Sequence, residues 1–211
     1  MSRRPRDSSD AKNQAAALGC RAHTGWAALV AIAGDAVRPW VVLRCRAELA
    51  DPTGNIRRNV YQTARGLEPA TAAGLVEAAE RIASERAAVS IEQALRQADA
   101  DGARVETCGV VVGMAPAGAG LESILRSHAL AHAAEGRLYQ GALLRGAASC
   151  GLKALPVPKR SIWTLGESAL GITGSELRCV LDGLRGEVGP PWAEDQKLAA
   201  LAAWVALAQS R

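Results

Sequence analysis

The sequence predicts an α/β domain in which helices cover a mixed β-sheet. Three observations predict this class. The 211 residues are 49% hydrophobic and 22% charged, which is the composition of one folded domain of ordinary size. Two apolar runs near the N-terminus flank a short glycine-containing turn, as in an antiparallel hairpin. Beyond them, stretches with helical spacing alternate with short apolar runs, as expected for parallel strands joined by helices.

The elements follow from local patterns. Residues 26–33 form a continuous apolar run that ends at Gly34-Asp35, and residues 39–49 alternate apolar with charged side chains; together they predict the hairpin. The turn-rich segment after the hairpin leaves room for a short strand at residues 59–62. Later elements are expected as a helix over 68–97, a strand over 105–112, a loop over 113–120, a helix over 121–150, a strand over 152–157, and helices over 175–186 and 193–209.

Composition also sets the domain boundaries and the kind of core. Residues 1–17 are expected to be a disordered basic arm, since Arg3, Arg4 and Arg6 stand among proline, serine and aspartate. Residues 18–211 are expected to form a single domain. The chain has no phenylalanine and only 3% aromatic residues. The core must therefore consist of small aliphatic side chains between closely approaching elements.

Charge and cysteine usage restrict partners and compartment. The net charge of +4 permits binding to DNA or RNA without requiring it. The five cysteines are an odd number without a CxxC pair, which favours free thiols in a reducing compartment. The longest apolar run, residues 198–208, is shorter than the ~20 residues that span a bilayer, and no apolar region follows the N-terminal arginines. We therefore expect a cytoplasmic protein without a membrane partner.

Two of the three histidines lie four residues apart, in the segment from His128 to His132. On one continuous helix at about 100° per residue, His128, His132 and Glu135 continue an apolar stripe. Imidazoles at this spacing converge on a metal ion, and a carboxylate one turn later adds a ligand or orients a ring. A structural polar network within the helix packing is the alternative. The HExxH motif of metalloproteases is absent.

Other candidates stand beside predicted element ends. His23 lies in a polar segment that leads into the first hairpin strand, where either a ligand contact or a plain strand entry is expected. Asp195 lies in the first turn of the last helix, where it either points inward or stabilises the helix dipole. The basic residues near turns that could bind phosphates are Arg57, Arg58, Lys159 and Arg160.

The element order and three short segments resemble a known superfamily. The segments are Thr24-Gly25-Trp26, Ser123-Ile-Leu-Arg126, and Glu194-Asp195 followed by the alanine-rich residues 198–203. They are similar to the first strand, second helix and last helix of RuvC-type Holliday junction resolvases, within the RNase H-like superfamily. The resemblance covers roughly residues 18–209, and it implies an RNase H-like mixed sheet and a nucleic-acid partner.

A second resemblance is to a set of uncharacterised bacterial proteins that carry the segments HTGW, SHALxHAAEG and PPWxxDQKLAALAAW. This chain has them at residues 23–26, 127–136 and 190–204. That resemblance implies no particular activity.

The carboxylates that RuvC-type nucleases use are largely missing. Those enzymes hold two Mg²⁺ ions with acids from the first strand, the end of the central strand and the last helix, so that the ions clamp the attacking and leaving oxygens. Here residues 18–32 contain no acid, and the central strand ends in Val112-Gly113-Met114. Only Asp195, beside Glu194, remains. An ordinary two-metal reaction is therefore not expected.

The histidines are expected to replace these acids at one end of the sheet. The predicted catalytic set is His23, His128, His132, Glu135 and Asp195, with one divalent ion on His128, His132 and Asp195. Three functions remain open. The first is an RNase H-like nucleic-acid-binding protein with a degenerate or rebuilt nuclease site. The second is a metal- or ligand-dependent enzyme that uses His128, His132 and Glu135 on a small substrate. The third is a non-catalytic assembly module, for which a homodimer is expected.

Overall fold

The computed structural model describes residues 14–35, 38–113 and 118–210. Within these residues, five strands form one sheet in the order β3-β2-β1-β4-β5. The elements are β1 Gln14–His23, β2 Trp26–Gly34, β3 Pro39–Glu48, α1 Val60–Ala64, α2 Pro69–Ala100, β4 Ala103–Val112, α3 Leu121–Arg126, α4 His128–Ser149, β5 Lys153–Pro158, α5 Ile162–Leu170, α6 Gly174–Gly183, α7 Arg185–Val188 and α8 Glu194–Ala208.

The sheet is mixed, as the sequence predicts. Strand β1 pairs antiparallel with β2 and parallel with β4. The pair β2–β3 is antiparallel, and β4–β5 is parallel. The carboxyl ends of β1, β4 and β5 therefore meet at one edge of the sheet, at His23, Val112 and Pro158, which we call the carboxyl edge. Ligands of open α/β sheets bind outside such an edge.

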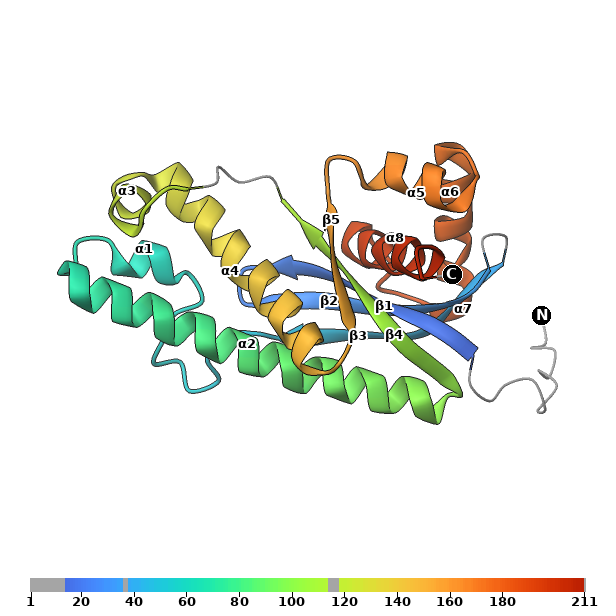
Figure 1. Cartoon of the computed structure of the whole chain (residues 1–211), viewed down its shortest axis with the longest axis horizontal. Coiled ribbons are helices and arrows are strands. Elements are labelled where there is room, and N and C mark those ends of the chain that lie inside the picture. Colours follow the sequence, from blue (N-terminus) through green and yellow to red (C-terminus); the bar gives the residue numbers. More distant parts are fainter. Residues whose placement is uncertain (1–13, 36–37, 114–117, 211) are drawn as a thin grey trace.

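Helices cover both faces of the sheet (Figure 1). Alternate β1 residues divide between two hydrophobic clusters, because successive strand side chains point to opposite faces. Leu18 and Cys20 join the cluster formed with α2 and α4. Ala17 joins the cluster formed with α5, α6 and α8. Helices α1 and α3 pack on α4 and lie away from the sheet, at one end of the molecule.

Small residues allow α8 to lie directly on the sheet. A Cβ atom on Gly19 would overlap the carbonyl oxygen of Ala199, and one on Gly109 would overlap that of Ala202. Ala199, Ala202 and the other central alanines of α8 are completely buried. The predicted core of small side chains and closely approaching elements is confirmed.

The structure corrects the predicted start of the domain. Strand β1 begins at Gln14, so residues 14–17, assigned to the arm from sequence, belong to the middle strand of the sheet. Residues 1–13, the rest of the predicted arm, lie outside the described residues. β1 contains five alanine or glycine residues among its ten, and such residues have low strand propensity. The close approach of α8 requires one of them, Gly19.

Three other expectations differ from the structure. Residues 59–62 are not a strand, because helix α1 begins at Val60. The predicted helix over 121–150 is broken at Ser127, whose backbone is extended and whose hydroxyl accepts from the N–H of Leu130. Helix α5 was not expected, because residues 162–170 contain a glycine and few charges.

All five cysteines lie in the described residues and are free thiols. None of the described helices has the length and apolar character required to cross a membrane.

Candidate nucleic-acid interface

His23 and Asp195 meet at the carboxyl edge. His23 is the last residue of β1, and Asp195 lies in the first turn of α8. The Nε2 atom of His23 lies 2.7 Å from Oδ1 of Asp195, a hydrogen-bond distance. Both side chains are partly open to solvent, at 35% and 28% of their surface. The pairing follows from the close contact of α8 with β1, which places the first turn of the helix over the end of the strand.

Arg21 places a guanidinium beside Asp195. It lies two residues before His23 and therefore on the same face of β1. Its Nε atom is 3.9 Å from Oδ1 of Asp195, and its Nη1 group donates to the carbonyl of Ala22. Its side chain is 16% exposed. Asp195 thus has a guanidinium and an imidazole of its own chain as neighbours.

A stacked column extends from His23 toward β3. The ring of His23 is stacked on that of Trp26, with centroids 4.5 Å apart and planes 9° apart. The guanidinium of Arg46 lies over the indole of Trp26, 3.9 Å from its centroid. The Nε–H of Arg46 donates to Oε1 of Glu48. The face of the β2–β3 hairpin beside Asp195 therefore presents aromatic and cationic groups.

Arg44 fixes the loop that leads into α8. Its Nη1 group donates to the carbonyls of Gly189, at 3.0 Å, and of Pro191. Its Nη2 group donates to the carbonyl of Pro190 at 3.3 Å. The buried indole of Trp192 then donates to the carbonyl of Leu181 at 2.6 Å. These bonds set the direction in which α8 begins, and with it the position of Asp195.

The structure does not bring His128 and His132 to Asp195. Helix α4 packs with the opposite hydrophobic cluster from α8, so the sheet separates them. Both histidines are exposed, and Nδ1 of His128 lies 3.5 Å from Nη1 of Arg65. The predicted inward stripe assumed a continuous helix over 121–150. The break at Ser127 places His128 at the exposed first position of α4 instead.

Glu135 is buried, unlike the two histidines that precede it on α4. It is 2% exposed, and its Oε1 atom accepts from the N–H groups of Tyr61, at 2.8 Å, and Gln62, at 3.2 Å. Its Oε2 atom is buried without a hydrogen-bond partner among the described residues. Burial raises the pKa of Glu135 to about 7, although these backbone N–H groups act in the opposite direction. Its contacts are those of the predicted structural alternative, a polar network that fixes α1 on α4.

The four predicted phosphate-binding residues are all exposed. Lys159 and Arg160 follow β5 at the carboxyl edge, where the Lys159 N–H donates to the carbonyl of Val112. The side chain of Arg58 lies against the turn at Gly25, where an added Cβ would come within 3.1 Å of the Arg58 Cβ. Arg57 is its neighbour in the same loop. Arg58 therefore lies at the same turn as His23.

The residues at this edge do not fit a two-metal centre. Two divalent ions need several carboxylate oxygens as ligands. Asp195 supplies one carboxylate, and Arg21 and His23 already occupy its surroundings. In the described part of the chain, no group of three or more His, Cys, Asp or Glu side chains could hold a metal. The predicted ion on His128, His132 and Asp195 thus has no common site there.

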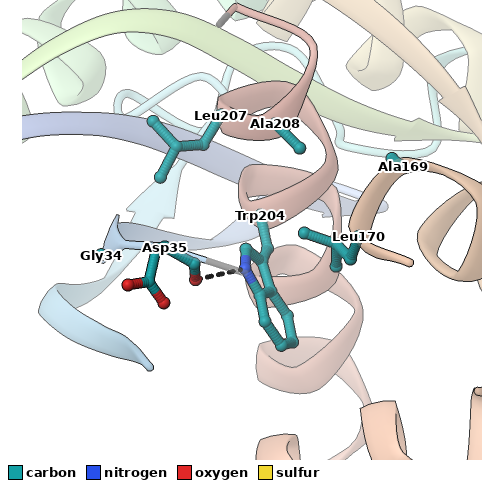
Figure 2. Close-up of a pocket in the computed structure, with 7 residues that line it drawn as sticks. All are labelled: Gly34, Asp35, Ala169, Leu170, Trp204, Leu207 and Ala208. Atoms are coloured by element: carbon teal, nitrogen blue, oxygen red, sulfur yellow. Dashed lines mark hydrogen bonds between the residues drawn. The ribbon is translucent and has the colours of Figure 1, made fainter. Parts of the chain in front are cut away.

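A separate pocket lies near the far end of α8 (Figure 2). The indole N–H of Trp204 donates to the carbonyl of Asp35 beside it, at 3.2 Å. Apart from Gly34 and Asp35, the pocket is lined by apolar side chains: Ala169, Leu170, Trp204, Leu207 and Ala208. Asp195 lies nine residues before Trp204 on α8, which is about 14 Å along the helix axis. The pocket is therefore distinct from the His23–Asp195 pair.

The arrangement of the sheet and its helices is RNase H-like, with antiparallel N-terminal strands followed by parallel ones. Two solved structures of RuvC from Thermus thermophilus share it. RuvC in complex with a Holliday junction substrate matches with a TM-score of 0.54 and 13% identity, over 93% of this chain and 94% of that one. A second RuvC structure matches with a TM-score of 0.54 and 14% identity, over 93% and 95%. At this identity the likeness shows the fold alone. Neither a family model nor a curated protein matches the chain.

Sequence reasoning missed Arg21, Trp26, Arg44 and Arg46 as members of this region. A signal for Arg44 and Arg46 was present. Arg44, Arg46 and Glu48 alternate with Leu43, Cys45 and Ala47, so all three share one face of β3. The sequence could not show that α8 leaves the end of this face uncovered.

Proposed function

We propose that this chain is an RNase H-like nucleic-acid-binding protein whose carboxyl edge has lost the acids of a two-metal nuclease. The observation that carries the proposal is the contact of Asp195 with His23 and Arg21. Asp195 is the acid that the RuvC resemblance leaves in place, and a guanidinium and an imidazole from β1 stand beside it instead of further carboxylates. Such an edge attracts phosphate and lacks the ligands to hold two Mg²⁺ ions.

Three further features support a nucleic-acid partner. The net charge is +4. Arg46, Arg58, Lys159 and Arg160 are exposed around the carboxyl edge. One of the structural neighbours is a RuvC in complex with a Holliday junction substrate, so branched DNA is the natural first probe.

The test is binding of the full chain to a fluorescent four-way junction, with duplex DNA, single-stranded DNA and RNA in parallel. We expect measurable affinity at about 50 mM salt that falls steeply toward about 200 mM, because counterions are released from the phosphates. We expect no cleavage of any probe with Mg²⁺ or Mn²⁺. Absence of binding to every probe at low salt would refute the proposal. Cleavage that requires a divalent ion would refute the loss of the nuclease site.

A rebuilt nuclease site is the second candidate, and the hydrogen bond between His23 and Asp195 favours it. A carboxylate that holds one ring nitrogen of a partly exposed imidazole orients that ring as a general base. This candidate predicts cleavage that persists in excess chelator and is lost in His23→Ala. The same probes, incubated with EDTA, distinguish it from binding alone.

The other two functions have less support. The small-substrate enzyme requires His128, His132 and Glu135 to act together, whereas both histidines are exposed and Glu135 is buried against α1. A homodimer and a cytoplasmic location stay predictions.

A further inference from the structure

Arg46 is held in a fixed plane on the open face of the β2–β3 hairpin. The indole of Trp26 lies under its guanidinium, 3.9 Å from ring centroid to Cζ, and Oε1 of Glu48 accepts from its Nε–H. Trp26 is itself stacked against His23 on its partner strand. Two contacts thus orient a long side chain that is 54% exposed.

The outer edge of this guanidinium is available to a ligand. A guanidinium carries five N–H donors, and Glu48 uses the one on Nε. In the residues that the structure describes, no hydrogen bond is seen from either Nη group of Arg46. Arg44, two residues earlier, differs in this respect, because its Nη groups donate to the carbonyls of residues 189–191. Arg46 has the open fork, and Arg44 has a structural role.

We propose that Arg46 binds a phosphodiester group of the nucleic-acid backbone through its two Nη groups. The inference rests on the proposed function and adds a specific contact to it. The planar fork matches two phosphate oxygens, and prior fixation by Trp26 and Glu48 reduces the entropy lost on binding. The guanidinium of Arg21, 3.9 Å from Oδ1 of Asp195, reduces the repulsion between that carboxylate and a phosphate nearby.

The contact predicts loss of affinity without loss of sequence preference, because phosphate contacts carry no base information. Arg46→Lys keeps the charge and removes the fork, whereas Arg46→Gln removes both. Arg81→Lys and Arg81→Gln are the matched controls. Arg81 is an exposed arginine on α2 whose Nη1 lies 3.0 Å from Oε1 of Glu85, so it has a similar ion pair far along the chain from the hairpin.

Affinity for the four-way junction and for a duplex is measured against salt for the wild type and all four variants. We expect Arg46→Lys to weaken both probes about five- to tenfold. Arg46→Gln is expected to weaken them further and to reduce the salt slope by about one unit. The Arg81 variants should bind like the wild type.

Each alternative outcome has a defined meaning. If Arg46→Lys binds as tightly as the wild type, a point charge suffices and the fork is refuted. If the wild type binds but Arg46→Gln is unaffected, the inference fails while the proposed function stands. If the wild type binds no probe, the proposed function fails and the inference fails with it. Thermal melting of each variant confirms that an exposed substitution has left the fold intact.

Discussion

Gly19 and Ala199 lie backbone against backbone, so closely that a Cβ on Gly19 would overlap the Ala199 carbonyl oxygen and come within 2.7 Å of the Ala203 nitrogen. No rotamer can relieve such a clash, because the opposing atoms belong to a helix backbone. The contact explains why the β1 face beneath α8 has a glycine at this position. It also connects the sheet directly to the helix that carries Asp195.

Gly19→Ala is therefore expected to push α8 away from β1 and to lower the free energy of unfolding by at least about 2 kcal/mol. Urea denaturation measures the loss. Gly74→Ala is the control: Gly74 lies in α2 with no atom within 4 Å of an added Cβ, so alanine should stabilise the helix by about 1 kcal/mol. Equal stability of Gly19→Ala and the wild type would contradict the close contact.

Glu135 predicts a pH dependence of stability. Its pKa is raised from 4.5 to about 7 in the folded protein. The folded state therefore holds this proton more tightly than the unfolded state, so stability from this group is complete below about pH 4.5 and is lost as the pH rises toward 7. The loss amounts to about 3 kcal/mol.

Glu135→Gln removes this titration while keeping an oxygen for the N–H groups of Tyr61 and Gln62. The stability of the variant relative to the wild type should increase between about pH 4.5 and pH 7, measured by urea denaturation at several pH values. Glu77→Gln, at an exposed position of α2, is the control. If the free energies of unfolding of Glu135→Gln and the wild type depend on pH in the same way, the carboxyl ionises in the folded protein without loss of stability, and the prediction is wrong.

Asp195→Asn tests the electrostatic balance of the carboxyl edge. The substitution leaves Arg21 and His23 without their anion, which should cost about 1 kcal/mol of stability. It also adds one unit of positive charge, so affinity for nucleic acid should rise and the salt slope should steepen. Weaker binding by Asp195→Asn would mean that the carboxylate contacts the ligand itself.

Arg44→Lys tests the fixation of the loop before α8. Lysine cannot reproduce the fork that contacts the carbonyls of Gly189, Pro190 and Pro191. We expect a loss of about 1–2 kcal/mol, faster amide exchange at Trp192 and a changed NMR signal of the His23 ring. Arg96→Lys is the control, because Arg96 makes an exposed ion pair with Glu92 at 2.9 Å. An unchanged His23 signal would separate Arg44 from the candidate interface.

The sequence predicted the elements whose periodicity agrees with their environment. The hairpin of β2 and β3, helix α2 and strand β4 have clear patterns and were placed correctly. Strand β1 is rich in alanine and glycine, and at Gly19 the reason is the close approach of α8, a tertiary contact that local propensity cannot express. The Ser127 break was missed because residues 121–126 and 128–149 continue the same helical spacing across one capping serine.

The candidate site was predictable where it depends on rare residues. His23 and Asp195 were identified as neighbours, and the structure places them in contact. His128 and His132 were projected inward on a helix that does not continue through Ser127. Arg46 was missed because an arginine on a strand is usually a solvated surface residue. The stacking that orients its guanidinium depends on Trp26, which lies on the neighbouring strand β2.

The ion pair that neutralises Asp195 has a consequence for how the protein would respond to its surroundings. A site that depends on Mg²⁺ to bring phosphate and carboxylate together is switched off by chelation. Here the counter-charges are covalently part of the chain. Attraction for a polyanion should consequently persist in EDTA, with the salt concentration as its main ionic regulator.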